Sequence, residues 1–403
     1  MKPTFDRAAF YLTCGSIISI LFSIAVSQIL LALALAALLF SSQKIKLPAF
    51  RLQLGLFLGI TVVAWLASGH IQEGTPQIRK FFVFVVLLVV LSTFRTVKEV
   101  RTIVLLWAAT VGLSAIRSLF QFLEKYRQAQ EQHQNFYDFY VGERITGFMS
   151  HWMTFGGEEM IVLLLLAAYL FFSTERRWKF VGWLCAAVLT ISMVLGYTRS
   201  IFLLGFPVGL MYLLWFWHRW LVAAVPVLAV VVFLLSPGWM KERVTSIFEP
   251  HGQTDSNMHR MILRRTGVAM IKAHPLLGIG PEETNHQFEQ WVPADIPRPL
   301  PVGWYGHLHN IYLHYAAERG IPTMLMLMWL LLKTLYDFWR GLAVTPPGRS
   351  NRRFLLHGGI AVVLATMVAG FFELNLGDSE VLTMFLVVVA CGYLSLEKDV
   401  VVG

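Results

Sequence analysis

The amino-acid sequence predicts an all-α polytopic membrane protein with about twelve transmembrane helices and one large polar segment outside the membrane. Hydrophobic residues make up 56% of the 403 residues and charged residues 14%, whereas a soluble domain has roughly 45–50% and 25%. The apolar residues gather into runs close to the roughly 20 residues that a helix needs to cross the hydrocarbon core. Lysine and arginine cluster in alternate connections between these runs. This positive-inside pattern accounts for the net charge of +9 without a nucleic-acid partner.

The first apolar run follows Lys2 and Arg7, and hydrophobicity continues past Leu39. A cleaved signal peptide would end in small residues and a polar mature start, so we expect an uncleaved first span. The second run is short, and the tenth is long enough to tilt or project from the membrane. The predicted spans are residues 8–24, 26–41, 51–69, 79–95, 101–121, 152–173, 178–196, 200–217, 220–236, 310–335, 354–373 and 380–396.

The basic connections fix the expected orientation, because positively charged loops stay in the cytoplasm. They contain Lys44, Lys46, Arg51, Arg95, Lys98, Arg101, Arg176, Arg177, Lys179, Arg219, Lys333, Arg340, Arg349, Arg352 and Arg353. Both termini then lie in the cytoplasm, and the remaining loops lie outside. Two of the outer loops are long, 122–151 and 237–309. The chain therefore divides into transmembrane helices 1–9 (1–236), an outer loop with short helices (237–309) and transmembrane helices 10–12 (310–403).

Several kinds of site are not indicated by the sequence. Cys14, Cys185 and Cys391 lie far apart within apolar runs, with no paired spacing for zinc or disulfides. There is no Walker A loop and no dinucleotide-binding glycine motif. A metal site built from His307, His309 and His314, with His286 as a further ligand, is an alternative, but no carboxylate accompanies these histidines in a fixed pattern. We expect neither a metal nor a cofactor.

Arginines in the outer loops suggest an anion site. Arg260 and Arg264 are four residues apart and share a helix face, and Arg265 is adjacent. Arginine suits this role because its planar fork binds phosphate bidentately. Arg199 lies between two apolar runs on the outer side, where positive-inside bias disfavours it. The alternatives are an amphipathic helix lying on lipid headgroups and a snorkelling Arg199.

His309 stands where the polar segment meets the tenth span. Histidine titrates near neutrality, so it can take a proton from a hydroxyl group as a general base. The alternative is a histidine that only forms hydrogen bonds at the membrane interface.

These motifs, taken in order, resemble the O-antigen ligase family, which also contains O-antigen polymerases. The family's outer loop ends in His, then Asn, Ser or Gln, nine residues, Gly, two residues, and Gly, Thr or Tyr. Here His309-Asn310 is followed by nine residues, Gly320, two residues and Thr323. Arg199 resembles the family arginine that follows a stretch rich in Thr and Ser.

The family's arginine helix and the turn that follows it are also matched. Arg260 and Arg265 match its two arginines, while Arg264 stands in place of a family Trp and His259 in place of a Ser. The turn is matched by Pro275, Leu276, Gly278 and Gly280. The resemblance covers roughly residues 190–325.

The resemblance implies a GT-C-like membrane enzyme of the bacterial inner membrane with its active site on the periplasmic side. It would be an inverting, metal-independent glycosyltransferase that moves O-antigen from undecaprenyl pyrophosphate to a sugar hydroxyl of lipid A–core. His309 would be the catalytic base, and Arg199, Arg260, Arg264 and Arg265 are the candidate pyrophosphate ligands. The sequence does not say which of the three helix arginines points inward.

Three other functions remain open. Within the family, a polymerase would use another O-antigen chain as acceptor, and a protein O-oligosaccharyltransferase would use a Ser or Tyr. The absence of a large extra C-terminal domain favours the ligase. Twelve spans also suit a transporter or flippase, but the polar residues crowd one outer loop and no two related halves are evident.

Overall fold

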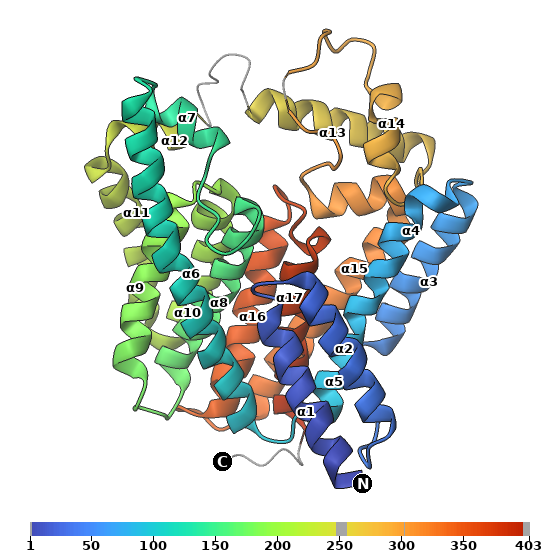
Figure 1. Ribbon diagram of the computed structural model, residues 1–403, viewed down its shortest axis with the longest axis vertical. Coiled ribbons are helices and arrows are strands. Elements are labelled where there is room, and N and C mark those ends of the chain that lie inside the picture. The colour runs from blue at the N-terminus through green and yellow to red at the C-terminus, as the bar shows by residue number, and fades with distance from the viewer. Residues whose placement is uncertain (1, 247–255, 302, 398–403) are drawn as a thin grey trace.

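The computed structural model describes residues 2–246, 256–301 and 303–397, and within these ranges every regular element is helical (Figure 1). Each of the twelve predicted apolar runs coincides with helix. The helices of the first six runs are α1 (Lys2–Ser19), α2 (Ile24–Leu39), α3 (Arg51–Ala67), α4 (Ile71–Arg79) continuing through η1 (Lys80–Phe84) into α5 (Val85–Thr93), α6 (Val97–Glu131) and α8 (Trp152–Phe172). Those of the last six are α9 (Lys179–Leu195), η2 (Ser200–Gly205) with α10 (Phe206–His218), η3 (Arg219–Ala223) with α11 (Ala224–Leu235), α15 (Ile311–Val344), α16 (Asn351–Ala369) and α17 (Ser379–Leu396).

By length and composition, seven helical stretches of the described chain can cross a membrane. Three further apolar helices, α2, α3 and α9, are shorter. The stretch Ser200–Leu235 counts once although it holds two of the predicted runs, which meet at η3. The all-α membrane-protein class is therefore confirmed, and the count of twelve crossings stays a prediction.

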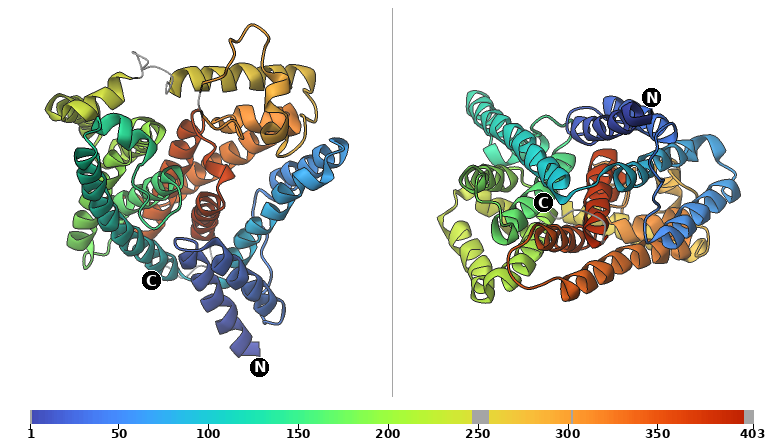
Figure 2. Two further views of the ribbon diagram at one scale, coloured as in Figure 1. Left: turned by 45° about the horizontal axis from the view of Figure 1, so that its top comes forward. Right: turned by 90° about the horizontal axis from the view of Figure 1, so that it is seen from below.

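Helix α8 forms the centre of the bundle. Nearly all of its residues from Thr154 to Phe172 are buried, which is the fate of a helix that is hydrophobic all round. Helices α6, α9, α10, α16 and α17 pack against it. Figure 2 shows the C-terminal helices near the middle of the bundle and the N-terminal helices at its edge. By contrast, α11 has no buried residue.

Four short helices cover one end of the bundle (Figure 1). They are α7 (Phe136–Gly142), α12 (Gly238–Thr245), α13 (Ser256–Ala273) and α14 (Glu283–Trp291). All four come from the two long polar segments, 122–151 and 237–309; residues 247–255 and 302 of the second lie outside the described part. A small hydrophobic core that includes Ile262, Leu263, Met270 and Phe288 joins α13 and α14 to the start of α15.

The basic connections gather at the opposite end, where α1 begins (Figure 1). Lys46 forms an ion pair with Glu397, and Arg352 donates a hydrogen bond to the Glu397 carbonyl. Arg101 and Glu175, from two further basic connections, lie 3.8 Å apart. Cationic loops and polar helices therefore occupy opposite ends, as the charge pattern predicted.

Several helices extend beyond their predicted spans, and α6 and α15 show differences that have a physical cause. α6 runs to Glu131, ten residues past the predicted span, because Phe122 and Tyr126 pack their rings against Phe136 of α7. α15 contains a break at Gly320, where φ is 85°. Such a backbone is accessible to glycine and strained for other residues.

Candidate functional site

A cavity of about 800 Å³ lies at the end of the bundle that carries the polar helices. Its wall combines cationic, polar and apolar side chains from η2, α13, the start of α15 and the loop after α16. The lining residues are Arg199, Ser200, Leu203, Leu204, Asn257, Arg260, Met261, Arg264, Leu308, His309, Asn310, Leu313, Phe371 and Phe372. Segments more than a hundred residues apart therefore build one site.

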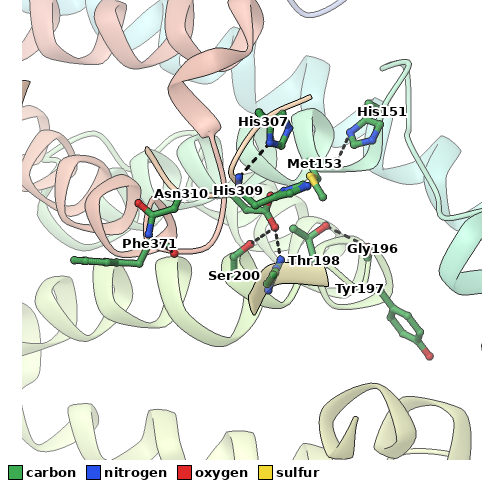
Figure 3. Close-up of polar contacts among 12 residues, drawn as sticks. His151, Met153, Gly196, Tyr197, Thr198, Ser200, His307, His309, Asn310 and Phe371 are labelled. Carbon is green, nitrogen blue, oxygen red and sulfur yellow. Dashed lines mark hydrogen bonds and ion pairs between the residues drawn. The ribbon is translucent and has the colours of Figure 1, made fainter. Parts of the chain in front are cut away.

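His309 is held in the cavity wall by its neighbours. Its φ of 45° is unusual for a residue with a side chain, and strain of this kind collects at functional sites. The His309 N–H donates to Nδ1 of His307 at 3.2 Å (Figure 3). Asn310 caps α15 by accepting from the Leu313 N–H at 2.8 Å, and its amide donates to the Phe371 carbonyl at 2.9 Å. The His-Asn pair thus fastens the start of α15 to the loop after α16.

Glu373, in that loop, is the functional residue that sequence reasoning missed. It is only 3% exposed, and its Oε2 lies 3.2 Å from Nδ1 of His309. Its Oε1 accepts from Arg260 at 2.9 Å and from the Ser200 hydroxyl at 3.2 Å. Burial alone would raise the pKa of Glu373, but the hydrogen bond to His309 and the charge of Arg260 outweigh it and lower the pKa to about 2. An ionised carboxylate can only accept a hydrogen bond, so this contact favours the tautomer of His309 that carries its proton on Nδ1.

The contact between Glu373 and Nδ1 of His309 leaves the other ring nitrogen, Nε2, available to accept a proton. Among the described residues, no hydrogen bond reaches Nε2 of His309. A carboxylate that holds Nδ1–H fixes the tautomer in which Nε2 accepts a proton. One signal for Glu373 was present in the sequence: it is the sole charged residue between Arg353 and Asp378, at the outer end of an apolar run.

Three of the four predicted arginines line the cavity with His309. Arg199 is 7% exposed and donates to the Ser246 hydroxyl at 3.4 Å. Arg260 reaches Glu373, and Arg264 lies at the rim. Arg265 does not line this cavity: it forms an ion pair of 2.6 Å with Asp295 and lines a second hollow farther along α13.

Two further arginines lie near this centre. Arg243 of α12 is 5% exposed, and its Nε and one terminal nitrogen donate to the Tyr197 carbonyl at 3.2 and 3.1 Å. Tyr197, two residues before Arg199, has φ 55°. The guanidinium of Arg144 lies over the Trp152 ring, and burial, then the like charge of Arg243, lower its pKa to about 9. Arg144 and Arg243 also lie in predicted outer loops, where positive-inside bias disfavours arginine, so the reasoning that selected Arg199 could have found them too.

The other histidines of the motif do not assemble a metal site with His309. Burial, then the nearby His309, lowers the pKa of His307 to about 2, so its ring stays neutral and Nδ1 accepts the His309 N–H. Within the described ranges, one group of three possible metal ligands comes together, His70, Glu73 and Glu283. It contains none of the histidines named from the sequence.

The turn Pro275–Pro281, which carries the Pro and Gly residues of the family motif, has a structural role. Backbone hydrogen bonds join it to the break in α15. The Ile279 N–H donates to the Ala317 carbonyl at 2.9 Å, and the Ile321 N–H donates to the Pro275 carbonyl at 2.8 Å. A Cβ on Gly278 would lie 2.2 Å from the Glu318 backbone, and one on Gly320 would lie 1.9 Å from the Leu276 carbonyl oxygen. The glycines of both motifs therefore allow one close backbone contact, which joins α13 to α15.

Comparison with protein families places the site residues in a known context. Residues 184–328 match the model of the family described as O-antigen ligase. The matched range contains Arg199, the α13 arginines, the glycine turn and His309, but it ends before Glu373. A search of curated proteins gave no match.

Proposed function

We propose that the protein is a lipopolysaccharide ligase of the bacterial inner membrane, in line with the match of residues 184–328 to the O-antigen ligase family model. It transfers O-antigen polysaccharide from undecaprenyl pyrophosphate to a sugar hydroxyl of lipid A–core on the periplasmic face. The observation that carries the proposal is the pairing of His309 with buried Glu373 in a cavity that Arg199 and Arg260 also line.

His309 is the catalytic base in this proposal. Its Nε2 accepts the proton of the acceptor hydroxyl while the hydroxyl oxygen attacks the anomeric carbon from the face opposite the leaving group. Glu373 holds Nδ1–H at 3.2 Å and stabilises the imidazolium that forms. General base assistance of this kind contributes about 10²–10⁴-fold to the rate.

The arginines stabilise the leaving group. As the bond from the anomeric carbon to the pyrophosphate oxygen breaks, its electron pair leaves with undecaprenyl pyrophosphate. Arg199, Arg260 and Arg264 line the cavity and offer cationic donors for that growing charge. The guanidinium groups supply the positive charge, so the proposal requires neither a metal nor a nucleotide.

The apolar part of the cavity suits a lipid-linked donor. Leu203 and Leu204 of η2 face the same space as Phe371 and Phe372, and Phe371 is 56% exposed. A polyprenyl chain can lie along such a wall while its pyrophosphate meets the arginines. Confinement of both substrates to the membrane then supplies proximity.

The test is glycan transfer by the purified protein in EDTA buffer, with undecaprenyl-pyrophosphate-linked O-antigen and lipid A–core as substrates. We expect transfer by the wild type and none by His309→Ala. His286→Ala, an exposed histidine of α14 away from the cavity, is the matched control and should keep full activity. Undiminished transfer by His309→Ala would contradict the base assignment, and loss of wild-type transfer in EDTA would contradict metal independence.

A deletion strain separates ligase from polymerase. Cells that lack a ligase accumulate O-antigen on the carrier lipid, whereas cells that lack a polymerase attach a single repeat to the core. We expect the first pattern. A protein O-oligosaccharyltransferase would instead glycosylate a Ser or Tyr, and a flippase would move the donor across vesicles without forming a glycosidic bond.

A further inference from the structure

Helix α13 carries cations along its length, and only those near its start line the cavity with His309. Arg260 and Arg264 line the reaction cavity, while Arg264, Arg265 and Lys272 line a second hollow of about 400 Å³. Val268 and Ala269 form the floor of this hollow and Pro293 its far wall. Residues 264, 268 and 272 are spaced four apart and so lie in one row along the helix. The short side chains at 268 and 269 leave the space between the cations open.

The hollow carries an excess of positive charge. Asp295 is the carboxylate that the structure pairs with these cations, through Arg265 at 2.6 Å. Both side chains of that pair are solvent-exposed, at 39% and 66%, so solvent screens the pair and a dianion can displace Asp295. Two arginine forks and one ammonium group around a small open space match the oxygens of a phosphate ester.

Arg264 connects this hollow to the reaction cavity, because its side chain lines both. The two hollows therefore adjoin at Arg264, and a molecule whose phosphate lies beside Arg265 and Lys272 can extend past Arg264 into the cavity that holds His309. The proposed donor pyrophosphate has its own cations, Arg199 and Arg260, in the reaction cavity. A phospholipid headgroup has no reason to be held next to the catalytic base, whereas an acceptor does.

We propose that the hollow lined by Arg264, Arg265 and Lys272 binds a phosphate group of the acceptor glycolipid and so presents its hydroxyl to His309. The proposal rests on the proposed glycosyl transfer and names the acceptor class, a phosphorylated glycolipid. It also gives Arg265 a different substrate from the one that the family resemblance implies. A neutral glycan or a protein hydroxyl gains nothing from this hollow.

The test compares two acceptors and two variants with purified full-length protein in phosphatidylcholine vesicles. The acceptors are lipid A–core and the same lipid A–core after phosphatase treatment; the variants are Arg265→Ala and Lys272→Ala. We expect removal of the phosphates to raise the acceptor KM of the wild type about tenfold or more, since one hydrogen bond to a charged group contributes about that factor. Each variant should raise the acceptor KM for the phosphorylated acceptor and leave the donor KM and kcat unchanged.

A control variant and three possible results decide whether the hollow binds acceptor phosphate. Arg127→Ala removes an exposed arginine at the outer end of α6, away from both cavities, and should leave both KM values unchanged. A rise in donor KM or a fall in kcat with Arg265→Ala would assign Arg265 to the pyrophosphate and overturn the proposal. Equal acceptor KM for both acceptors would overturn it as well. Dependence on phosphatidylglycerol in the vesicle instead of acceptor phosphate would make the hollow a headgroup site.

Wild-type transfer in the same assay tests the proposed function separately. If the wild type transfers glycan to both acceptors with equal KM, the glycosyltransferase function stands and the phosphate hollow fails. If it transfers to neither acceptor while the carrier lipid binds, the proposed function fails.

Discussion

At the scale of single residues, Glu373 organises the candidate site. It joins the loop after α16 to η2 through Ser200, to α13 through Arg260 and to the start of α15 through His309. A buried carboxylate is costly unless it is paired and hydrogen-bonded, and these three partners meet that requirement. The same contacts orient the proposed base, so we expect both the stability of the site and the proposed catalysis to depend on this one side chain.

Glu373→Gln therefore tests the orientation of His309. The amide keeps the volume of the carboxylate but loses its charge, so the imidazolium is no longer stabilised. We expect kcat to fall by up to about 10⁴-fold, the scale of the loss when the carboxylate that orients a catalytic histidine is changed to an amide. Steady-state glycan transfer by the purified variant measures this loss.

Unfolding of the same variant provides a second readout. The pKa of Glu373 is lowered from 4.5 to about 2 in the folded protein. Its ionised form therefore adds to the free energy of unfolding above about pH 4.5, and this stabilisation is lost as pH falls toward 2. A pKa shift of this size corresponds to roughly 3 kcal/mol of unfolding free energy. Thermal unfolding in detergent should therefore show a weaker acid destabilisation for Glu373→Gln than for wild type. Glu143→Gln, a solvent-exposed outer-loop control, should behave as wild type in both assays.

At the scale of elements, the glycine turn after α13 and the break in α15 form one joint. α13 carries Arg260, and α15 begins beside His309, so their relative position decides whether the arginine and the base share a cavity. The joint is made of backbone contacts at Gly278 and Gly320, where no side chain fits. We infer that the spacing from His309 to Gly320 matters because it sets the distance from the base to this joint.

Gly320→Ala should disrupt the contact between the turn after α13 and the break in α15. The substitution adds backbone strain at φ 85° and a contact of 1.9 Å with the Leu276 carbonyl oxygen, and backbone cannot move aside as a flexible side chain can. We expect a loss of roughly 3 kcal/mol or more in unfolding free energy, measured by chemical denaturation in detergent micelles. Transfer activity should fall with it.

Gly69→Ala is the matched control for this prediction. Gly69 also has a positive φ, 74°, but an added Cβ would meet nothing within 4 Å. Its cost should be limited to backbone strain, about 1 kcal/mol. Equal losses for the two variants would show that strain alone, and not the contact between turn and helix, makes Gly320 necessary.

At the scale of the whole molecule, the two ends of the bundle differ in how their positive charges are arranged. The cationic connections pair with Glu175 and Glu397 at one end, while the arginines of the candidate site gather at the other end with His309. The second group lines the cavity with His309, whereas Lys333 and Arg340 at the first end line a hollow beside Asp337 and Glu397. The cationic loops of the first end are the predicted cytoplasmic side, and the arginines of the second end are the proposed substrate ligands.

Cysteine labelling tests this orientation. In a background with Cys14, Cys185 and Cys391 replaced by alanine, Arg127→Cys should react with a membrane-impermeant maleimide applied to the periplasmic side. Arg349→Cys, also exposed but at the opposite end, should react only after the inner membrane is opened. Labelling of both positions, or of Arg349→Cys alone, from the periplasm would contradict the predicted topology.

The sequence by itself determined the helical membrane class, the positions of the apolar helices and the segments that carry His309 and the arginines. These follow from local properties, since the length of an apolar run and the sign of the loop charges are readable along the chain. The family motifs added the His–Gly spacing. Break points such as Gly320 within α15 were not readable, because a backbone break depends on the turn that packs against it.

Only the tertiary structure decided which of these side chains meet. Arg260 and Arg264 turn toward His309 while the adjacent Arg265 turns toward Asp295, because neighbours on a helix point about 100° apart and the packing of Ile262 and Leu263 sets its rotation. Glu373 lies 64 residues from His309 in sequence, beyond any local pattern. A carboxylate becomes a functional partner through burial beside a base and an arginine, and burial is a property of the folded chain.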